Sequence, residues 1–199
     1  MSLLFTPFYL PFFGLMILFL FSYLSMLPFG YKVKILLAVY IFTILFPTFL
    51  IHLYRKYWGW THIQIGARER RMIPYIISIL CYFLCFYLMN MAHVPYFISS
   101  VLIAALLIQI VCAIINVWWK VSTHTAAIGG VAGALVAYSF LLMFNPVWWL
   151  CLVVFVAGLV ATSRMILRQH TLPQVVGGFF VGIICAYVAI LRISLNLSI

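Results

Sequence analysis

Acidic side chains are almost absent from this sequence, which contains one, Glu69, against eleven lysines and arginines. Charged residues make up 6% of the 199 residues, whereas soluble domains contain about a quarter. One carboxylate cannot build a two-metal site, because Mg²⁺ and Ca²⁺ are held mainly by carboxylate oxygens. The five cysteines lie inside apolar segments, without the spacing of a zinc or haem motif. We therefore expect neither a metal nor a cofactor.

Sequence repeats and low-complexity linkers are also missing, and hydrophobic residues account for 68% of the chain. This composition predicts a polytopic membrane protein. The length allows a single integral membrane domain, residues 1–199, without a separate soluble domain. No alternating β-barrel pattern is present, so the backbone must satisfy its hydrogen bonds within helices. The sequence predicts an all-α transmembrane bundle of six to seven helices, with apolar segments at roughly 7–27, 33–54, 74–92, 95–118, 125–144, 146–162 and 174–195.

Three local features refine this prediction. The segment 146–162 is short for a span at about 1.5 Å per residue, so we expect a steep or broken helix there. Prolines mark segment boundaries, and Pro74 is expected to mark the start of one. The stretches GGVAG (129–133) and GGFFVG (177–182) supply small residues and predict close packing between helices.

Polar residues gather in three connections between the apolar segments. They are Arg55, Lys56, Arg68, Glu69, Arg70 and Arg71 in the first connection, Lys120, Ser122, Thr123 and His124 in the second, and Ser163, Arg164, Arg168, Gln169 and His170 in the third. Two apolar segments separate each connection from the next, and an even number of crossings returns the chain to the same side. We therefore expect all three clusters at one end of the bundle, with only Lys32, Lys34, His93 and Arg192 near the other.

The positive charge in these connections has two interpretations. Attraction to lipid headgroups and the positive-inside rule account for cations such as Arg55 and Lys56. They account less well for Lys120 and Arg164, which abut apolar helices and stand near serine and histidine. Ionisable residues at such positions are functional candidates. Cations that converge without carboxylates favour an anion site, and phosphate is the commonest anion in a membrane. A helix that starts near Thr125 would add backbone N–H donors.

Two short motifs carry a family resemblance. SRMILRQH (163–170) matches a Ser-Arg-x5-His core, and VSTH (121–124) stands in the place of a Pro-Ser-Gly-His motif. With their flanks, NVWWKVSTHTAAIGG and SRMILRQHTLPQVVGGFFVG, they resemble a small, divergent bacterial branch of the type 2 phosphatidic acid phosphatases, the lipid phosphate phosphatase superfamily. The resemblance covers about residues 68–182 and places a phosphatase-like core at about 68–195.

The resemblance implies a metal-independent reaction through a phosphohistidine. His170 is then the nucleophile that attacks phosphorus, and His124 is the general acid that protonates the leaving group. Gln174 is expected to hold the nucleophile in place. The residues expected to bind the phosphoryl oxygens are Lys120, Ser122, Thr123, Ser163, Arg164, Arg71 and Arg68.

The chain departs from the family pattern in three places. RERRMIPY (68–75) stands for the family's Lys-x6-Arg-Pro motif, and Gln64 occupies the position of the lysine. Val121 and Thr123 replace the proline and glycine of the second motif. Gln174 replaces an aspartate four residues after the nucleophile. A glutamine carbonyl can fix the histidine tautomer but lacks the charge that stabilises imidazolium, so we expect a slower covalent step or a fold without activity.

Two function classes therefore stay open. The first is an integral membrane phosphatase that acts on lipid phosphate monoesters or diphosphates, such as phosphatidate or an isoprenyl diphosphate. The second is a non-catalytic lipid-phosphate binder, or a transport-related protein, on the same fold. The expected partners are the phospholipid or isoprenyl phosphate substrate and membrane lipid, with no nucleic acid and no obligate protein partner. The resemblance implies a bacterial inner membrane with the active site on the periplasmic side.

Overall fold

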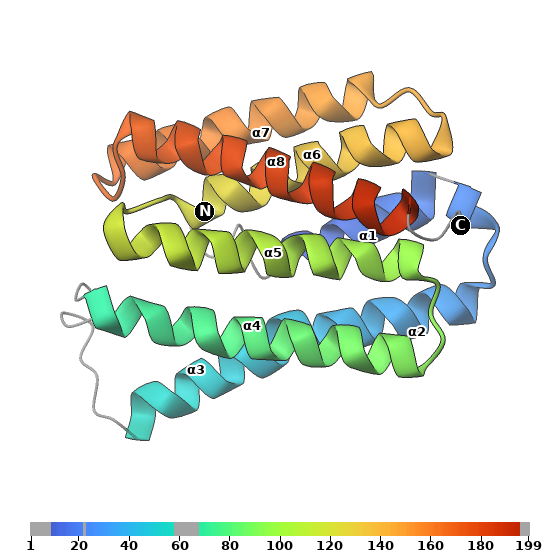
Figure 1. The fold of residues 1–199 in the computed structure, drawn as a ribbon, viewed down its shortest axis with the longest axis horizontal. Coiled ribbons are helices and arrows are strands. Elements are labelled where there is room, and N and C mark those ends of the chain that lie inside the picture. The colour runs from blue at the N-terminus through green and yellow to red at the C-terminus, as the bar shows by residue number, and fades with distance from the viewer. Residues whose placement is uncertain (1–8, 22, 58–67, 196–199) are drawn as a thin grey trace.

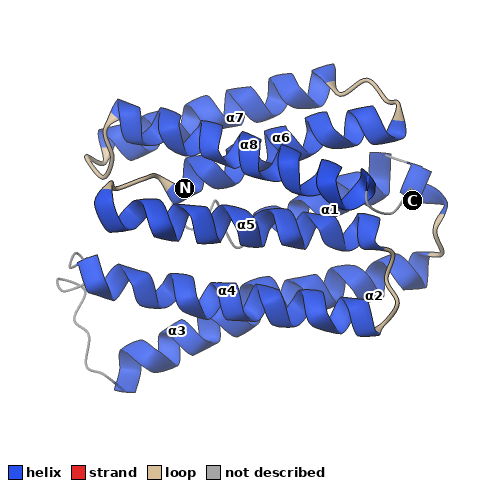
Figure 2. Cartoon of the chain, in the orientation of Figure 1, coloured by secondary structure: helices blue, strands red, loops and turns tan. Residues whose placement is uncertain are grey.

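The protein is described here by a computed structural model, which describes residues 9–21, 23–57 and 68–195. Every regular element within those residues is helical (Figures 1 and 2). The elements are α1 (Leu10–Phe21), η1 (Tyr23–Met26), α2 (Phe29–Tyr40), η2 (Ile41–Leu45), α3 (Phe46–Tyr57), α4 (Arg68–Met91), α5 (Tyr96–Trp118), α6 (Thr123–Leu142), α7 (Val147–Ile166) and α8 (Leu172–Leu195). The all-α prediction is confirmed.

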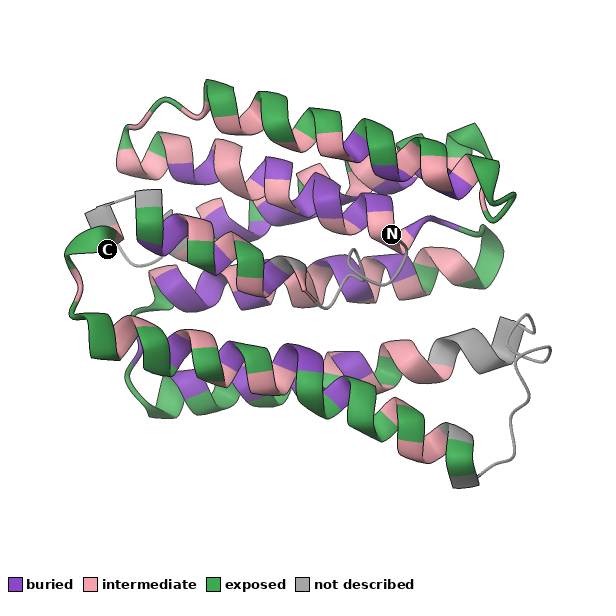
Figure 3. Cartoon of the chain, turned by 180° about the vertical axis from the view of Figure 1, so that it is seen from behind, coloured by how far each residue is buried: buried purple, intermediate pink, exposed green. Residues whose placement is uncertain are grey.

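Six helical stretches in the described part of the chain are long and apolar enough to cross a membrane. Their outward faces carry large apolar side chains, and Leu80, Trp148 and Phe155 are each more than half exposed. Figure 3 shows the exposed residues on the outside of the bundle and the buried ones between the helices. An apolar outer surface of this extent is suited to lipid rather than to water. The chain is a multi-pass membrane protein.

The first helix is shorter than the sequence predicts. The segment 7–27 was expected to span the membrane, but α1 has 12 residues, which makes it about 18 Å long against a hydrocarbon core of about 30 Å. A one-turn 3-10 helix, η1, follows it. Hydropathy reports how apolar a stretch is but not where its helix ends, so only the structure separates a half-length helix from a span.

The second span is a single long helix that contains a π-helical turn. The 12 residues of α2 continue through η2 into α3, and Pro47 is the second residue of α3, two residues after the end of η2. Proline has no N–H and its ring clashes with the preceding turn, and a π turn is one way for a helix to accommodate that defect. Inside η2, the Thr43 hydroxyl donates a hydrogen bond of 2.8 Å to the carbonyl of Val39.

Two boundary predictions are wrong. The helix expected to start at Pro74 starts at Arg68, and Pro74 lies inside α4. The segment 146–162 is neither short nor broken, because α7 has 20 residues and runs from Val147 to Ile166. Residues 161–166, ATSRMI, continue the helix past the last strongly apolar residues. The polar motif therefore begins within α7 rather than in a loop. The structure thereby sets Ser163 and Arg164 on a helix.

The tightest helix pair, α6 with α8, packs through glycines. A Cβ on Gly182 would lie 1.9 Å from the carbonyl oxygen of Ala126, and one on Gly129 would lie 2.0 Å from that of Phe179. Only hydrogen at these positions allows the two backbones to approach so closely. The prediction of close packing from the two glycine-rich stretches is confirmed. Since the motif residues lie at the starts of α6 and α8, this contact sets their separation.

Candidate functional site

The site lies at one end of the bundle, where α5 connects to α6 through residues 119–122 and α7 connects to α8 through residues 167–171. We call this the polar end; it is on the left in Figure 1, where α3 also ends and α4 begins. Two hydrogen bonds join the connections: Lys120 Nζ donates to the carbonyl of Gln169 at 2.6 Å, and the Ser122 N–H donates to that of Gln174 at 3.2 Å. The expected meeting of the second and third polar clusters is thus present.

His170 precedes α8 and is held by a residue of its first turn. The Oε1 atom of Gln174 lies 3.3 Å from His170 Nδ1 and also accepts the Thr171 N–H at 3.2 Å. The second contact follows from the sequence TLPQ, which has the capping-box pattern of threonine and glutamine three residues apart. One side-chain oxygen therefore caps α8 and faces the imidazole. With the proton on Nδ1, the ring donates to Gln174 and its lone pair is on Nε2.

Among the cations of the polar end whose side chains are described, Arg164 is the most buried, with 6% of its surface exposed. Its Nη1 donates a hydrogen bond of 2.5 Å to Oε1 of Gln169. The helix end explains this partner: Arg168 has a left-handed φ of 50°, and the N–H groups of Arg168 and Gln169 bond to the carbonyls of Met165 and Arg164. This Schellman arrangement turns the chain back over the last turn of α7.

His124 lies in the first turn of α6, within electrostatic range of both Arg164 and His170. Its Nε2 atom is buried and has no hydrogen-bond partner among the described residues, and the same is true of Ser122 Oγ. Ser122 precedes α6 but its side chain does not cap it. The first N–H groups of a helix have no partners within the helix. The start of α6 therefore presents unsatisfied donors, which suit an anion.

The remaining predicted phosphate-binding residues differ in their placement. Thr123 lies beside His124 and is half-buried. The Ser163 hydroxyl donates to the carbonyl of Val160 on its own helix at 2.8 Å, so its proton is not directed at a ligand. The backbone of Arg68 and Arg71 forms the start of α4, but their side chains lie outside the described residues.

Two residues of the site were not predicted from the sequence. Gln169 contacts both Lys120 and Arg164. Asn116, near the end of α5, accepts the Val121 N–H at 3.0 Å and donates to Tyr75 Oη at 3.0 Å. A lone amide in an apolar helix is itself a signal of function or packing, which points to Asn116. Gln169 gives no such signal, because its role depends on the turn at Arg168.

Across the parts of the chain that the structure describes, no three histidine, cysteine or acidic residues lie together as metal ligands do. The polar end instead combines two imidazoles, a buried guanidinium, an ammonium and unsatisfied backbone and hydroxyl donors. This set can bind a phosphoryl group, supply a nucleophilic nitrogen and transfer a proton. It lies at the end of an apolar bundle, where the headgroup of a membrane lipid also lies.

Comparison with known proteins gives one match. The family model of the PAP2 superfamily matches residues 117–197, which include both motifs and the described parts of α6, α7 and α8. No curated protein and no solved structure matches the chain. The matched region holds His124, Arg164, His170 and Gln174, whereas α1–α4 lie outside it.

Proposed function

Because residues 117–197 place the chain in the PAP2 superfamily, we propose that this protein is an integral membrane phosphatase acting on lipid phosphate monoesters or diphosphates. The observation that carries the proposal is the arrangement at the polar end. His170, with Nδ1 held 3.3 Å from Gln174 Oε1, lies at the start of α8, and His124 lies within electrostatic range of both His170 and the buried Arg164. The one acidic residue of the chain, Glu69, is in the first turn of α4, and its side chain lies outside the described residues.

In the proposed reaction, His170 Nε2 attacks phosphorus and the bond from phosphorus to the leaving oxygen breaks. His124 gives its proton to that oxygen, and the phosphoryl group stays on His170. His124 then takes a proton from water, the water oxygen attacks phosphorus, and the bond from phosphorus to Nε2 breaks to release inorganic phosphate. Arg164 and the N–H groups at the start of α6 stabilise the equatorial oxygens in both steps. To do so, Arg164 exchanges its contact with Gln169 for the phosphoryl group.

The reverse possibility, a lipid-phosphate binder without turnover, is favoured by one observation. The partner of His170 is a neutral glutamine that already serves as a helix cap. A neutral partner fixes the ring but does not stabilise the imidazolium that forms during transfer. Binding needs only the cations and the hydrogen-bond donors. Both functions therefore predict that a lipid phosphate binds at the polar end.

Phosphate release from the purified protein in EDTA tests the proposal. We expect the wild type to release phosphate from a lipid phosphate and His170→Asn to release none above background. His93→Asn is the matched control, because His93 is exposed at the other end of the bundle and asparagine tolerates its φ of 53°. Acid-labile, base-stable label on His170 after rapid quench with labelled substrate supports the covalent step. Binding without any release by the wild type would replace the enzyme with the binder.

A further inference from the structure

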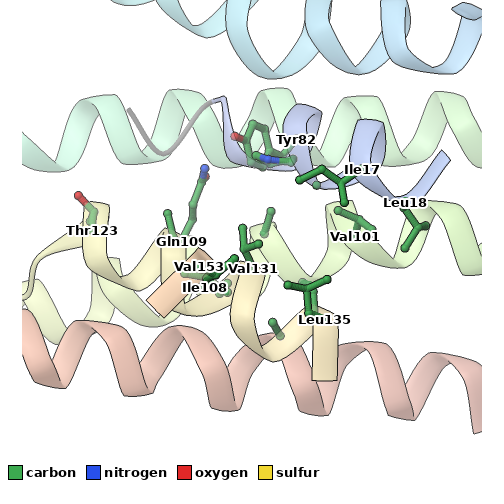
Figure 4. Close-up of a pocket in the computed structure, with 18 of the residues that line it drawn as sticks. Ile17, Leu18, Tyr82, Val101, Ile108, Gln109, Thr123, Val131, Leu135 and Val153 are labelled. Carbon is green, nitrogen blue, oxygen red and sulfur yellow. The ribbon is translucent and has the colours of Figure 1, made fainter. Parts of the chain in front are cut away.

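An apolar cavity of about 320 Å³ extends from the polar end into the bundle. Thr123 and His124 line it at the polar end, and α1, α4, α5 and α6 enclose its deeper part, where Ile17, Val101 and Leu135 are among the lining side chains (Figure 4). Its volume is within the range of sites for small molecules and cofactors. The short α1 contributes one wall, so the cavity depends on the element that the sequence misjudged.

Two polar side chains deep in this cavity have unmet hydrogen-bonding groups. Tyr82 is fully buried on α4 and Gln109 is 8% exposed on α5. The two side chains lie near enough to interact, but neither Tyr82 Oη nor Gln109 Oε1 makes a hydrogen bond of normal geometry among the described residues. Leaving such groups unsatisfied is costly, and native proteins rarely do so without a reason. Figure 4 shows Gln109 extending toward the side of the cavity where Tyr82 lies.

A third polar group in the cavity shows that the fold can satisfy such groups. The Tyr138 hydroxyl, also fully buried, lies 2.8 Å from Ser100 Oγ and donates to the carbonyl of Phe97 at 2.9 Å. Tyr138 is therefore complete within the protein, whereas Tyr82 and Gln109 are not. The difference points to a ligand that completes the second pair.

The depth of the pair defines what part of a ligand reaches it. A Cβ on Gly130 would lie 2.5 Å from the side chain of Ile108, so Ile108 packs against Gly130. Six residues of helix separate Gly130 from His124, which is about 9 Å along α6. Gln109 follows Ile108 toward the polar end, so it lies no deeper than that. In an acyl lipid, the linkage that joins chain to headgroup is a few bonds from the phosphate, and hydrocarbon follows it.

We propose that the cavity receives one hydrocarbon chain of the lipid phosphate and that Tyr82 and Gln109 hydrogen-bond its acyl linkage. The Tyr82 hydroxyl donates to the carbonyl oxygen, and Gln109 accepts from an amide N–H or hydroxyl where the lipid has one. The proposal rests on the proposed function and assigns its substrate class: acyl-linked lipid phosphates, ester or amide, in preference to isoprenyl phosphates. An isoprenyl chain has no group to satisfy either side chain.

The sharpest test compares phosphatidate with its dialkyl ether analogue, which has the same headgroup and chains but no carbonyl. We expect wild-type kcat/KM to favour the ester about tenfold, since a hydrogen bond to a buried group is of that order. Tyr82→Phe should reduce the ratio toward one, chiefly through KM, whereas Gln109→Leu should keep it, because neither lipid has a linkage donor for Gln109 Oε1. Tyr87→Phe, an exposed tyrosine on the same helix, should keep the wild-type ratio. Equal rates with both lipids in the wild type would overturn the proposal.

Ceramide 1-phosphate and farnesyl phosphate separate the sources of the linkage. If the protein prefers ceramide 1-phosphate and Gln109→Leu abolishes that preference, the linkage bound in the cavity is an amide. If it prefers phosphatidate and Tyr82→Phe abolishes that preference, the linkage is an ester. Turnover of farnesyl phosphate as fast as that of both acyl lipids contradicts the selectivity.

A blocking variant tests the cavity itself. Ala105 is half-buried in the cavity lining, and Ala113 is half-buried on the same helix outside it. Ala105→Phe should lower turnover of phosphatidate at least about tenfold more than that of p-nitrophenyl phosphate, which has no chain to exclude. Ala113→Phe should leave that ratio as in the wild type. An equal loss with both substrates in Ala105→Phe would contradict a chain in the cavity.

Binding distinguishes failure of this inference from failure of the proposed function. Thermal stabilisation of the detergent-solubilised protein by the ester and ether lipids reports binding without chemistry. If the ester lipid stabilises the protein more than the ether lipid and no phosphate is ever released, the cavity assignment is supported and the proposed phosphatase activity is wrong. If phosphate is released equally from the two lipids, the proposed phosphatase activity is supported and the cavity assignment is wrong.

Discussion

Gly182 lies where α8 touches α6, and a methyl group there would meet the α6 backbone at Ala126 and Gly130. Its Cβ would be 1.9 Å from the carbonyl oxygen of Ala126 and 2.7 Å from the amide nitrogen of Gly130. Backbone atoms inside a helix cannot rotate away as a long side chain can. In Gly182→Ala the two helices must therefore separate by more than about 1 Å before these atoms reach ordinary contact.

Two opposing contributions set the change in the free energy of unfolding in Gly182→Ala. Alanine is better than glycine in a helix interior by about 1 kcal/mol. Overpacking typically costs about 1–3 kcal/mol, and contact with rigid backbone places this site at the upper end. We expect a net loss of about 2 kcal/mol, which lowers Tm by about 4–8 °C for a chain of this size. Gly158→Ala on α7 meets nothing within 4 Å, so it should keep only the favourable term.

The same separation reaches the site. His124 lies in the first turn of α6 and His170 precedes α8, and the N–H of Ser122 bonds to the carbonyl of Gln174 between the two helices. A misplacement of about 1 Å between reacting groups can reduce turnover about 100-fold. Thermal unfolding in detergent and phosphate release measure the two effects on the same preparation. A Gly182→Ala protein as stable and as active as Gly158→Ala would refute the reasoning.

Three further predictions concern the polar end. Gln174→Glu keeps the side-chain length and the capping box and adds the missing charge, so it should raise kcat, and a decrease would mean that His170 has another orienting partner. Asn116→Leu removes the acceptor of the Val121 N–H and the donor to Tyr75 Oη, so it should lower the free energy of unfolding by about 1–3 kcal/mol, measured by denaturant titration; no change would show that water replaces the amide. With the site on the periplasmic side, Leu167→Cys should react with an impermeant maleimide in intact cells, and Asn145→Cys only after permeabilisation; the opposite pattern reverses the orientation.

The sequence alone determined the class of fold and the chemistry of the polar end. Hydropathy is a local property, and lipid leaves a backbone few alternatives to helices, so the apolar segments specified a membrane bundle. Counting crossings then brought VSTH and SRMILRQH to one end.

Only the tertiary structure decided how these helices fit together. Hydropathy does not record the half length of α1, the π turn before Pro47 or the uninterrupted α7. Gln169 reaches Arg164 because the chain turns back at Arg168. The unsatisfied groups of Tyr82 and Gln109 become neighbours of one cavity only when α4 and α5 pack around it. Such features follow from packing between distant parts of the chain, where one methyl group at a glycine shifts a whole helix.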